Sequence, residues 1–127
     1  MRKKSKNSLV WMFVGIILAL GVIYYIYSGT KPGTYDAFAE CLGESGTTFY
    51  GAFWCPHCQS QKSKFGRSEK KLPYVECSQP NGQGQTKVCI DAGIESYPTW
   101  EFPDGTRETG DLSLPYLAEK TGCELPN

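Results

Sequence analysis

The longest apolar run of the chain lies near its beginning. Residues 9–27 read LVWMFVGIILALGVIYYIY and contain no charged side chain. A helix of this length spans about 28 Å, which matches the hydrocarbon thickness of a bilayer. Trp11 lies near one end of the run and three tyrosines lie near the other, where aromatic rings favour the two membrane interfaces. The pattern therefore predicts a transmembrane helix over residues 9–27.

Basic side chains are concentrated before this run. Four of the thirteen lysines and arginines lie within residues 1–8, and Lys31 alone follows soon after the run. By the positive-inside rule, residues 1–8 are a cytoplasmic basic segment, residues 9–27 are a signal-anchor helix, and the rest of the chain is extracytoplasmic. A cleaved signal peptide is one alternative, although the aromatic end of the run makes a poor cleavage region, and a buried core helix is another.

The residues after the run carry thirteen acidic and nine basic side chains, so their net charge is −4. An acidic domain without a basic stripe gives no reason to expect a nucleic-acid partner. The chain also contains six cysteines, an even number that favours disulfides in an oxidising compartment. Cysteine content and predicted topology therefore indicate the same location, the periplasm or an equivalent lumen.

After a Gly- and Pro-containing linker at 28–33, hydrophobic periodicity predicts one domain over residues 34–127. The expected elements are helices at 34–42, 56–71, 85–92 and 113–121 and strands at 47–54, 74–77, 99–102 and 106–110. Thr34 and Ser113 are the candidate N-caps of the first and last helices. The strand at 47–54 is apolar throughout, which is typical of a central strand covered on both faces. The order predicts a mixed sheet flanked by helices, of the α/β or α+β class.

The central strand leads directly into Trp54-Cys55-Pro56-His57-Cys58. Pro56 suits the first turn of a helix, which places Cys55 at the helix N-terminus, where unpaired N–H groups and the macrodipole favour a thiolate. Cys58 lies one turn further along the same face, near enough to form a disulfide. We interpret Cys55 as the exposed nucleophile and Cys58 as the resolving thiol, with His57 further stabilising the thiolate.

Two other interpretations of this motif are a static disulfide and half of a zinc site. A static bridge does not require a preceding buried strand and a proline at the start of a helix. A zinc site would need Cys77 and Cys89 as further ligands, which are not closely spaced, and His57 is badly placed to join both thiols. The strand-to-helix context favours redox chemistry over both.

A second feature is Pro98, about forty residues later and directly before a β-prone segment. Taken alone, it would be a trans proline at the start of a strand, because cis X–Pro bonds are uncommon. Residues 34–123 nevertheless resemble the thioredoxin superfamily, through the segments Phe53-Trp54-Cys55-Pro56-His57-Cys58, Gly93-Ile94 and Tyr97-Pro98-Thr99. More narrowly, the chain is similar to the thioredoxin-like partner domains of bacterial vitamin K epoxide reductase homologues in residues 50–58, 74–77, 97–102 and 117–123.

The resemblance implies a thioredoxin-like fold in which Pro98 is cis and packs against the active-site disulfide, while Tyr97 and Trp54 contact the substrate. It also implies extracytoplasmic disulfide-bond formation, in which electrons pass from the thiols of reduced secreted proteins to a quinone-coupled membrane enzyme like vitamin K epoxide reductase. The lipid bilayer is the further partner, through residues 9–27. We expect no metal and no cofactor besides the redox-active Cys55–Cys58 disulfide. A reductase or isomerase of the same compartment and a non-enzymatic zinc or interaction module are the alternative functions.

The chain departs from the superfamily pattern in two ways. The first strand and helix of a full thioredoxin are reduced to one helix. The buried acid that many thioredoxins carry six residues before the first active cysteine is Phe49 here, so the group that accepts the Cys58 proton is in doubt. Glu76 is a candidate by proximity in the sheet, and a solvated strand glutamate is the alternative interpretation of the same residue.

The other four cysteines suggest two further disulfides. Cys77 and Cys89 enclose a Gly- and Gln-rich loop that a disulfide would restrain, and the alternative is a second redox pair. Cys41 and Cys123 belong to the first and last helices of the domain, so a bridge between them would join its two ends.

Overall fold

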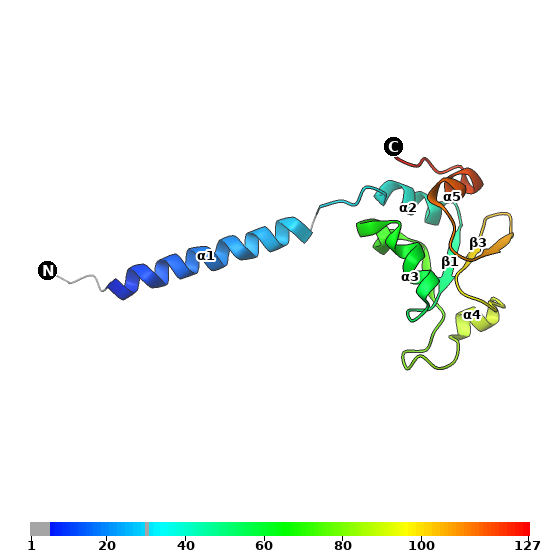
Figure 1. Cartoon of the computed structure of the whole chain (residues 1–127), viewed down its shortest axis with the longest axis horizontal. Helices are drawn as coiled ribbons and strands as arrows, with labels where there is room; N and C mark the ends of the chain where they lie inside the picture. Colours follow the sequence, from blue (N-terminus) through cyan, green and yellow to red (C-terminus); the bar gives the residue numbers. More distant parts are fainter. Residues whose placement is uncertain (1–5, 30) are drawn as a thin grey trace. The chain divides into compact units, whose positions relative to one another are not determined.

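The structure is a computed structural model that describes residues 6–29 and 31–127. The chain forms two compact units, one ending at Lys31 and one comprising Pro32–Asn127, and each is described by itself (Figure 1). Most of the predicted basic segment at 1–8, and Thr30 in the predicted linker, lie outside the described residues.

The described residues 6–29 of the first unit form the helix α1 (Lys6–Gly29), where the sequence predicts a transmembrane helix at 9–27. Within its stretch Asn7–Gly29, an 18-residue window has a mean hydropathy of 2.5. By length and composition this helix can cross a membrane, and a signal sequence near an N-terminus has the same properties.

The second unit is built on a four-stranded mixed sheet with the order β2-β1-β3-β4. Its strands are β1 (Thr48–Gly51), β2 (Tyr74–Glu76), β3 (Thr99–Glu101) and β4 (Arg107–Thr109). The β1 strand pairs in parallel with β2 and antiparallel with β3, which in turn pairs antiparallel with β4. The register places Phe49 opposite both Tyr74 and Trp100, and it places Gly51 opposite Glu76. The apolar run at 47–54 therefore does supply a central strand, as predicted, but the strand is limited to Thr48–Gly51, and Phe53 and Trp54 lie beyond its end and are exposed.

Helices cover both faces of this sheet. They are α2 (Asp36–Glu44), α3 (Pro56–Ser63), the 3₁₀ helix η1 (Gly66–Lys71), α4 (Lys87–Asp91) and α5 (Leu114–Thr121). Phe49 and Tyr50 are neighbours in β1, so their side chains point to opposite faces. Phe49 lies in a core with Leu42 of α2 and Leu117 of α5, whereas Tyr50 lies in a smaller core with Cys89 of α4. The α/β thioredoxin-like fold expected from the sequence is confirmed.

The centre of the larger core is aromatic. Phe49 and Trp100 are fully buried and stack with their ring centroids 4.5 Å apart. The Trp100 indole N–H donates to Oε1 of Gln61, which also accepts from the N–H of Leu112 at 2.7 Å. Gln61 is 0 % exposed, although the sequence suggests a solvated Gln-, Lys- and Ser-rich face on this helix. That expectation is wrong at Gln61 because its amide joins α3 to the sheet.

Three predicted helices also have wrong boundaries, and the one expected at 85–92 is α4 (Lys87–Asp91). The helix expected at 56–71 ends at Ser63 and is followed by η1, since Gly66 adopts φ +54°, a conformation that ends regular α-helix. Helix α2, expected at 34–42, begins at Asp36, with Tyr35 rather than Thr34 as its N-cap.

The last helix agrees with its prediction at both ends. The Ser113 hydroxyl caps it by accepting from the Tyr116 N–H, as predicted, and Gly122 follows its end in the left-handed conformation.

Candidate functional site

The two central thiols lie where β1 passes into α3. Cys55 is the N-cap of α3 and Pro56 is its first residue, so the Cys55 sulfur accepts a hydrogen bond from the Cys58 N–H at 3.4 Å. A helix N–H directed at sulfur stabilises the thiolate form. Both thiols are free in this structure. Cys55 is 5 % exposed and Cys58 is 0 % exposed; the prediction of an exposed Cys55 is therefore wrong in degree, although Cys55 is the more accessible of the two.

The Tyr97–Pro98 segment lies against Cys55, 42 residues away in sequence. The Tyr97–Pro98 peptide bond is cis, as the superfamily resemblance implies, and Pro98 is fully buried. The Cys55 thiol donates to the backbone carbonyl of Tyr97 at 3.7 Å. The rings of Tyr97 and Trp54 meet edge to face with centroids 6.0 Å apart. The structure thus brings together the predicted nucleophile and all three predicted substrate-contacting residues.

His57 is exposed on the first turn of α3. Within residues 6–29 and 31–127 its ring forms no hydrogen bond with Cys55 or Cys58. The predicted stabilisation of the Cys55 thiolate by His57 would therefore act through charge alone. This role of His57 stays a prediction.

Cys58 is held in its neutral form. Burial is the main cause and the hydrogen bond with Cys55 the second cause that raise the pKa of the Cys58 thiol to about 12, while the charge of Lys62 opposes the increase. Close packing causes this burial: a Cβ atom on Gly51 would lie only 3.0 Å from the Cys58 sulfur and 2.8 Å from a ring carbon of Tyr74. Glycine at position 51 therefore allows the thiol and the tyrosine to converge on the end of β1.

We expect Cys55 to be alkylated well before Cys58 when the reduced protein is treated with iodoacetamide at pH 7. A rise in the Cys58 pKa from 9.0 to about 12 lowers its thiolate fraction at pH 7 by about 1000-fold, and only the thiolate reacts. Mass spectrometry of peptides taken over time measures both rates. In Cys55→Ala the Cys55 contribution to the Cys58 pKa is lost but burial remains, so the rate should still be rising with pH at pH 9, and a plateau near or below pH 9 would contradict the assignment.

Glu76 is hydrogen-bonded on both carboxylate oxygens. One oxygen accepts from the backbone N–H groups of Ser78 at 2.8 Å and Phe53 at 3.2 Å, and the other accepts from the Tyr74 hydroxyl at 2.8 Å. Burial raises the pKa of Tyr74, and the hydrogen bond to Glu76 adds to this. Glu76 is therefore not the solvated strand glutamate of the alternative interpretation. It is joined through Tyr74 to the Cys58 side of the site, and its part in accepting the Cys58 proton stays a prediction.

The remaining cysteines form two disulfides with the predicted pairings. Cys41 is bonded to Cys123 and Cys77 to Cys89, across sequence separations of 82 and 12 residues. Cys77 and Cys89 are each 0 % exposed, so in this conformation no attacking thiolate can reach their sulfurs, which disfavours a second redox pair. Because both are consumed by the disulfide, neither supplies the thiolate that the zinc alternative required.

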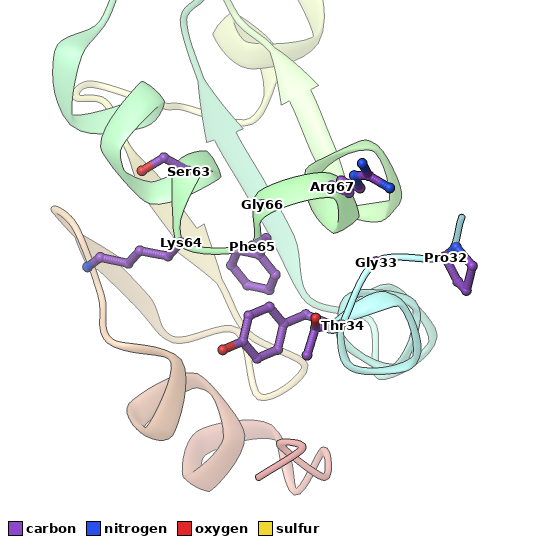
Figure 2. Close-up of a pocket in the computed structure, with 9 residues that line it drawn as sticks. Pro32, Gly33, Thr34, Ser63, Lys64, Phe65, Gly66 and Arg67 are labelled. Atoms are coloured by element: carbon purple, nitrogen blue, oxygen red, sulfur yellow. The ribbon is translucent and has the colours of Figure 1, made fainter. Parts of the chain in front are cut away.

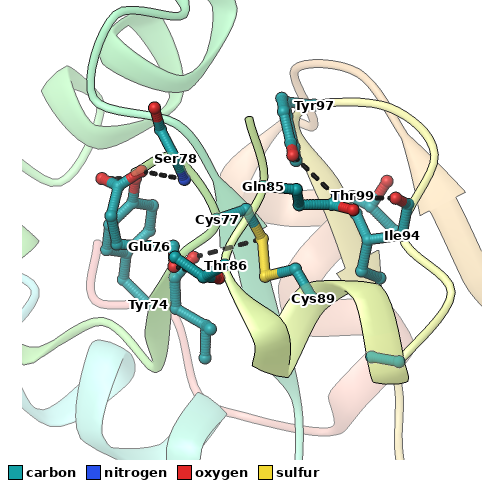
Figure 3. The surroundings of a disulfide bond; sticks show 12 residues. Tyr74, Glu76, Cys77, Ser78, Gln85, Thr86, Cys89, Ile94, Tyr97 and Thr99 are labelled. Carbon is teal, nitrogen blue, oxygen red and sulfur yellow. Dashed lines mark hydrogen bonds between the residues drawn. A yellow bond between two sulfur atoms is a disulfide. The ribbon is translucent and has the colours of Figure 1, made fainter. Parts of the chain in front are cut away.

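Two site residues could not be identified from the sequence. Ser78 accepts a hydrogen bond from the Trp54 indole N–H at 2.8 Å, and Gln85 donates one to the Tyr97 hydroxyl at 2.8 Å. Both lie in the polar loop between β2 and α4, beside the Cys77–Cys89 disulfide (Figure 3). Neither residue belongs to a recognisable motif, so only the folded structure identifies their contacts.

A pocket of about 360 Å³ lies elsewhere on this unit, between the segment preceding α2 and the junction of α3 with η1 (Figure 2). Its lining includes Thr34, Lys64 and Arg67. Neither thiol nor the Tyr97–Pro98 segment lines it, so it is not part of the redox site.

No protein-family model matches the chain. The chain is similar to Thiol-disulfide oxidoreductase LTO1 of Arabidopsis thaliana, with 45 % identity over 93 residues. The matched region is 70 % of this chain but only 24 % of LTO1, so the chain spans about a quarter of the length of that relative. Similarity to a thiol-disulfide oxidoreductase, together with the paired thiols at the N-terminus of α3, supports a redox function.

Proposed function

We propose that this protein is a membrane-anchored, extracytoplasmic thiol-disulfide oxidoreductase that promotes disulfide-bond formation in secreted proteins. The observation that carries the proposal is the position of Cys55. It caps α3, its sulfur accepts the Cys58 N–H, and the cis Tyr97–Pro98 segment lies against it. The similarity to LTO1 supports the same chemistry.

The exchange begins from the Cys55–Cys58 disulfide. A substrate thiolate attacks the Cys55 sulfur, the bond between the two cysteines breaks, and Cys58 leaves and takes up a proton, which its raised pKa favours. A second substrate thiolate then attacks the substrate sulfur of the mixed disulfide and releases Cys55 as a thiolate. The substrate loses two electrons and gains a disulfide, while the Cys55–Cys58 pair gains the two electrons.

Three features support oxidation as the net direction. The N–H bond to the Cys55 sulfur stabilises the reduced form, and a more stable reduced form makes the disulfide a stronger oxidant. The two disulfides elsewhere in the domain suit an oxidising compartment. The apolar α1 and the basic residues around its start support an anchor with a cytoplasmic N-terminus and an extracytoplasmic domain, in the periplasm or an equivalent lumen.

We further propose that a membrane enzyme resembling vitamin K epoxide reductase re-oxidises Cys55 and Cys58 and passes the two electrons to a quinone. The support is the resemblance of the segments around these cysteines to the thioredoxin-like partner domains of the bacterial homologues. In native membranes, re-oxidation of the reduced protein should then require quinone, and re-oxidation that continues unchanged after quinone extraction would contradict this partner.

The direction of exchange is tested by the reduction potential of the full chain in detergent, equilibrated against glutathione. An oxidant should lie well above thioredoxin's value of about −270 mV, towards the value of about −120 mV for a strong oxidant. The oxidised protein should also introduce disulfides into a reduced, unfolded model protein, and Cys55→Ala/Cys58→Ala should not. A potential near that of thioredoxin would instead indicate a reductase. Stoichiometric zinc without thiol exchange would indicate a non-enzymatic module.

A further inference from the structure

The polar segment at residues 78–86, here called the β2–α4 loop, is firmly held at its base. The Cys77–Cys89 disulfide joins the two segments that flank it. The Thr86 N–H donates to the Cys77 carbonyl at 2.8 Å, and Ser78 and Gln85 form an antiparallel bridge. The loop is therefore fixed relative to β2.

Gln85 connects this loop to the cis-proline segment. Its side-chain amide donates to the Ile94 carbonyl at 2.7 Å and to the Tyr97 hydroxyl at 2.8 Å (Figure 3). The Tyr97 carbonyl accepts from the Cys55 thiol. A single side chain of the loop thus fixes the ring of the residue that contacts the candidate nucleophile.

Ser78 holds the second ring. Its hydroxyl is buried with the residue only 4 % exposed, and it accepts from the Trp54 indole N–H at 2.8 Å. At Gly82, φ is +74° and a Cβ atom would lie 3.8 Å from the Phe53 ring and 3.9 Å from the Trp54 ring. The loop therefore binds the Trp54 side chain through Ser78 and passes beside the Phe53 ring at Gly82.

The surface that results is apolar and exposed around a recessed thiol. Phe53 and Trp54 are 46 % and 52 % exposed, whereas Cys55 is 5 % exposed. A polypeptide segment with apolar side chains beside its cysteine can cover these rings while its sulfur reaches Cys55. A small thiol gains little from the rings, because it has no apolar surface to bury against them.

We infer that Gln85 and Ser78, held by the Cys77–Cys89 disulfide, are positioning residues that set a preference for cysteines in apolar polypeptide segments over small thiols. The inference rests on the proposed exchange activity and extends it to the substrate class. Gln85 and Ser78 do not touch the reacting sulfurs, and they act by fixing Tyr97 and Trp54.

The test compares the full chain with Gln85→Ala, using two probes: a peptide whose cysteine is flanked by apolar residues, and glutathione. The ratio of kcat/KM for the peptide to kcat/KM for glutathione should fall about tenfold in Gln85→Ala, chiefly through a higher KM for the peptide. In a Tyr97→Phe background, Gln85→Ala should cause little further change, because the shared hydrogen bond is already lost. Gln83→Ala, an exposed position in the same loop, is the matched control and should keep the ratio of the unmodified chain.

An unchanged ratio in Gln85→Ala would overturn the inference, as would an equal fall in Gln83→Ala or full additivity with Tyr97→Phe. Cys77→Ala/Cys89→Ala, assayed below its unfolding temperature, should reproduce the Gln85→Ala ratio, and an unchanged ratio there would remove the disulfide from the inference. An unmodified chain that exchanges with neither probe would instead contradict the proposed function itself.

Discussion

Cys58→Ala should convert the protein into a trap that accumulates mixed disulfides with its substrates. Cys55 remains at the N-terminus of α3 and can still form a bond to a substrate cysteine, but the thiol that resolves the adduct is absent. Catalytic turnover should fall on the order of 10³-fold or more, because paired reactive groups act as a unit. Non-reducing electrophoresis of native membranes, followed by mass spectrometry, would identify the captured proteins.

Cys55→Ala provides the matched comparison. Its remaining free thiol is fully buried, and burial still raises its pKa after the Cys55 contribution is lost, so adducts should be nearly absent. Captured secreted proteins would identify the substrates, and a captured membrane enzyme would identify the regenerating partner. Equal adduct formation in both variants would show that Cys55 and Cys58 have been assigned the wrong roles.

Much of the fold was predictable because local patterns and global packing agree. The apolar run containing Phe49 forms a central strand, and Ser113 and Gly122 mark the two ends of the last helix. Which polar side chains are buried was less predictable, because tertiary contacts decide it. Gln61 looks like a surface residue in sequence, yet its amide binds Trp100 and Leu112 in the interior.

The residues of the candidate site also divide into those that the sequence identifies and those that only tertiary contacts identify. Cys55, Cys58 and Pro98 were identifiable because their chemistry depends on residue type and spacing, and the superfamily resemblance supplied the expected proximity. The contacts of Gln85 and Glu76 were not identifiable. A polar side chain in a loop or short strand carries no periodic signal, and its partner is fixed only when β1, β2 and the cis-proline segment come together.

Removing the Cys41–Cys123 disulfide should have the largest effect on stability. In the chain-entropy account, closing a loop of 82 residues restricts the unfolded chain by about 4.5 kcal/mol, and native disulfides in small domains are worth about 2–5 kcal/mol. We expect Cys41→Ala/Cys123→Ala to lower the free energy of unfolding by about 4 kcal/mol. For a domain of this size, the melting temperature should fall by roughly 15–30 °C, measurable by circular dichroism.

The Cys77–Cys89 disulfide offers an internal comparison because it closes a loop of only 12 residues. Its removal should cost less by about 1.7 kcal/mol, since loop-closure entropy grows with the logarithm of loop length. The two double variants also differ in function. Loss of Cys41–Cys123 should leave the peptide-to-glutathione preference intact below the melting temperature, because these two cysteines pack in the larger core, whereas Cys77 and Cys89 at the base of the β2–α4 loop belong to the smaller one. A reversed order of stabilities would show that packing around the buried Cys77–Cys89 pair outweighs chain entropy in this domain.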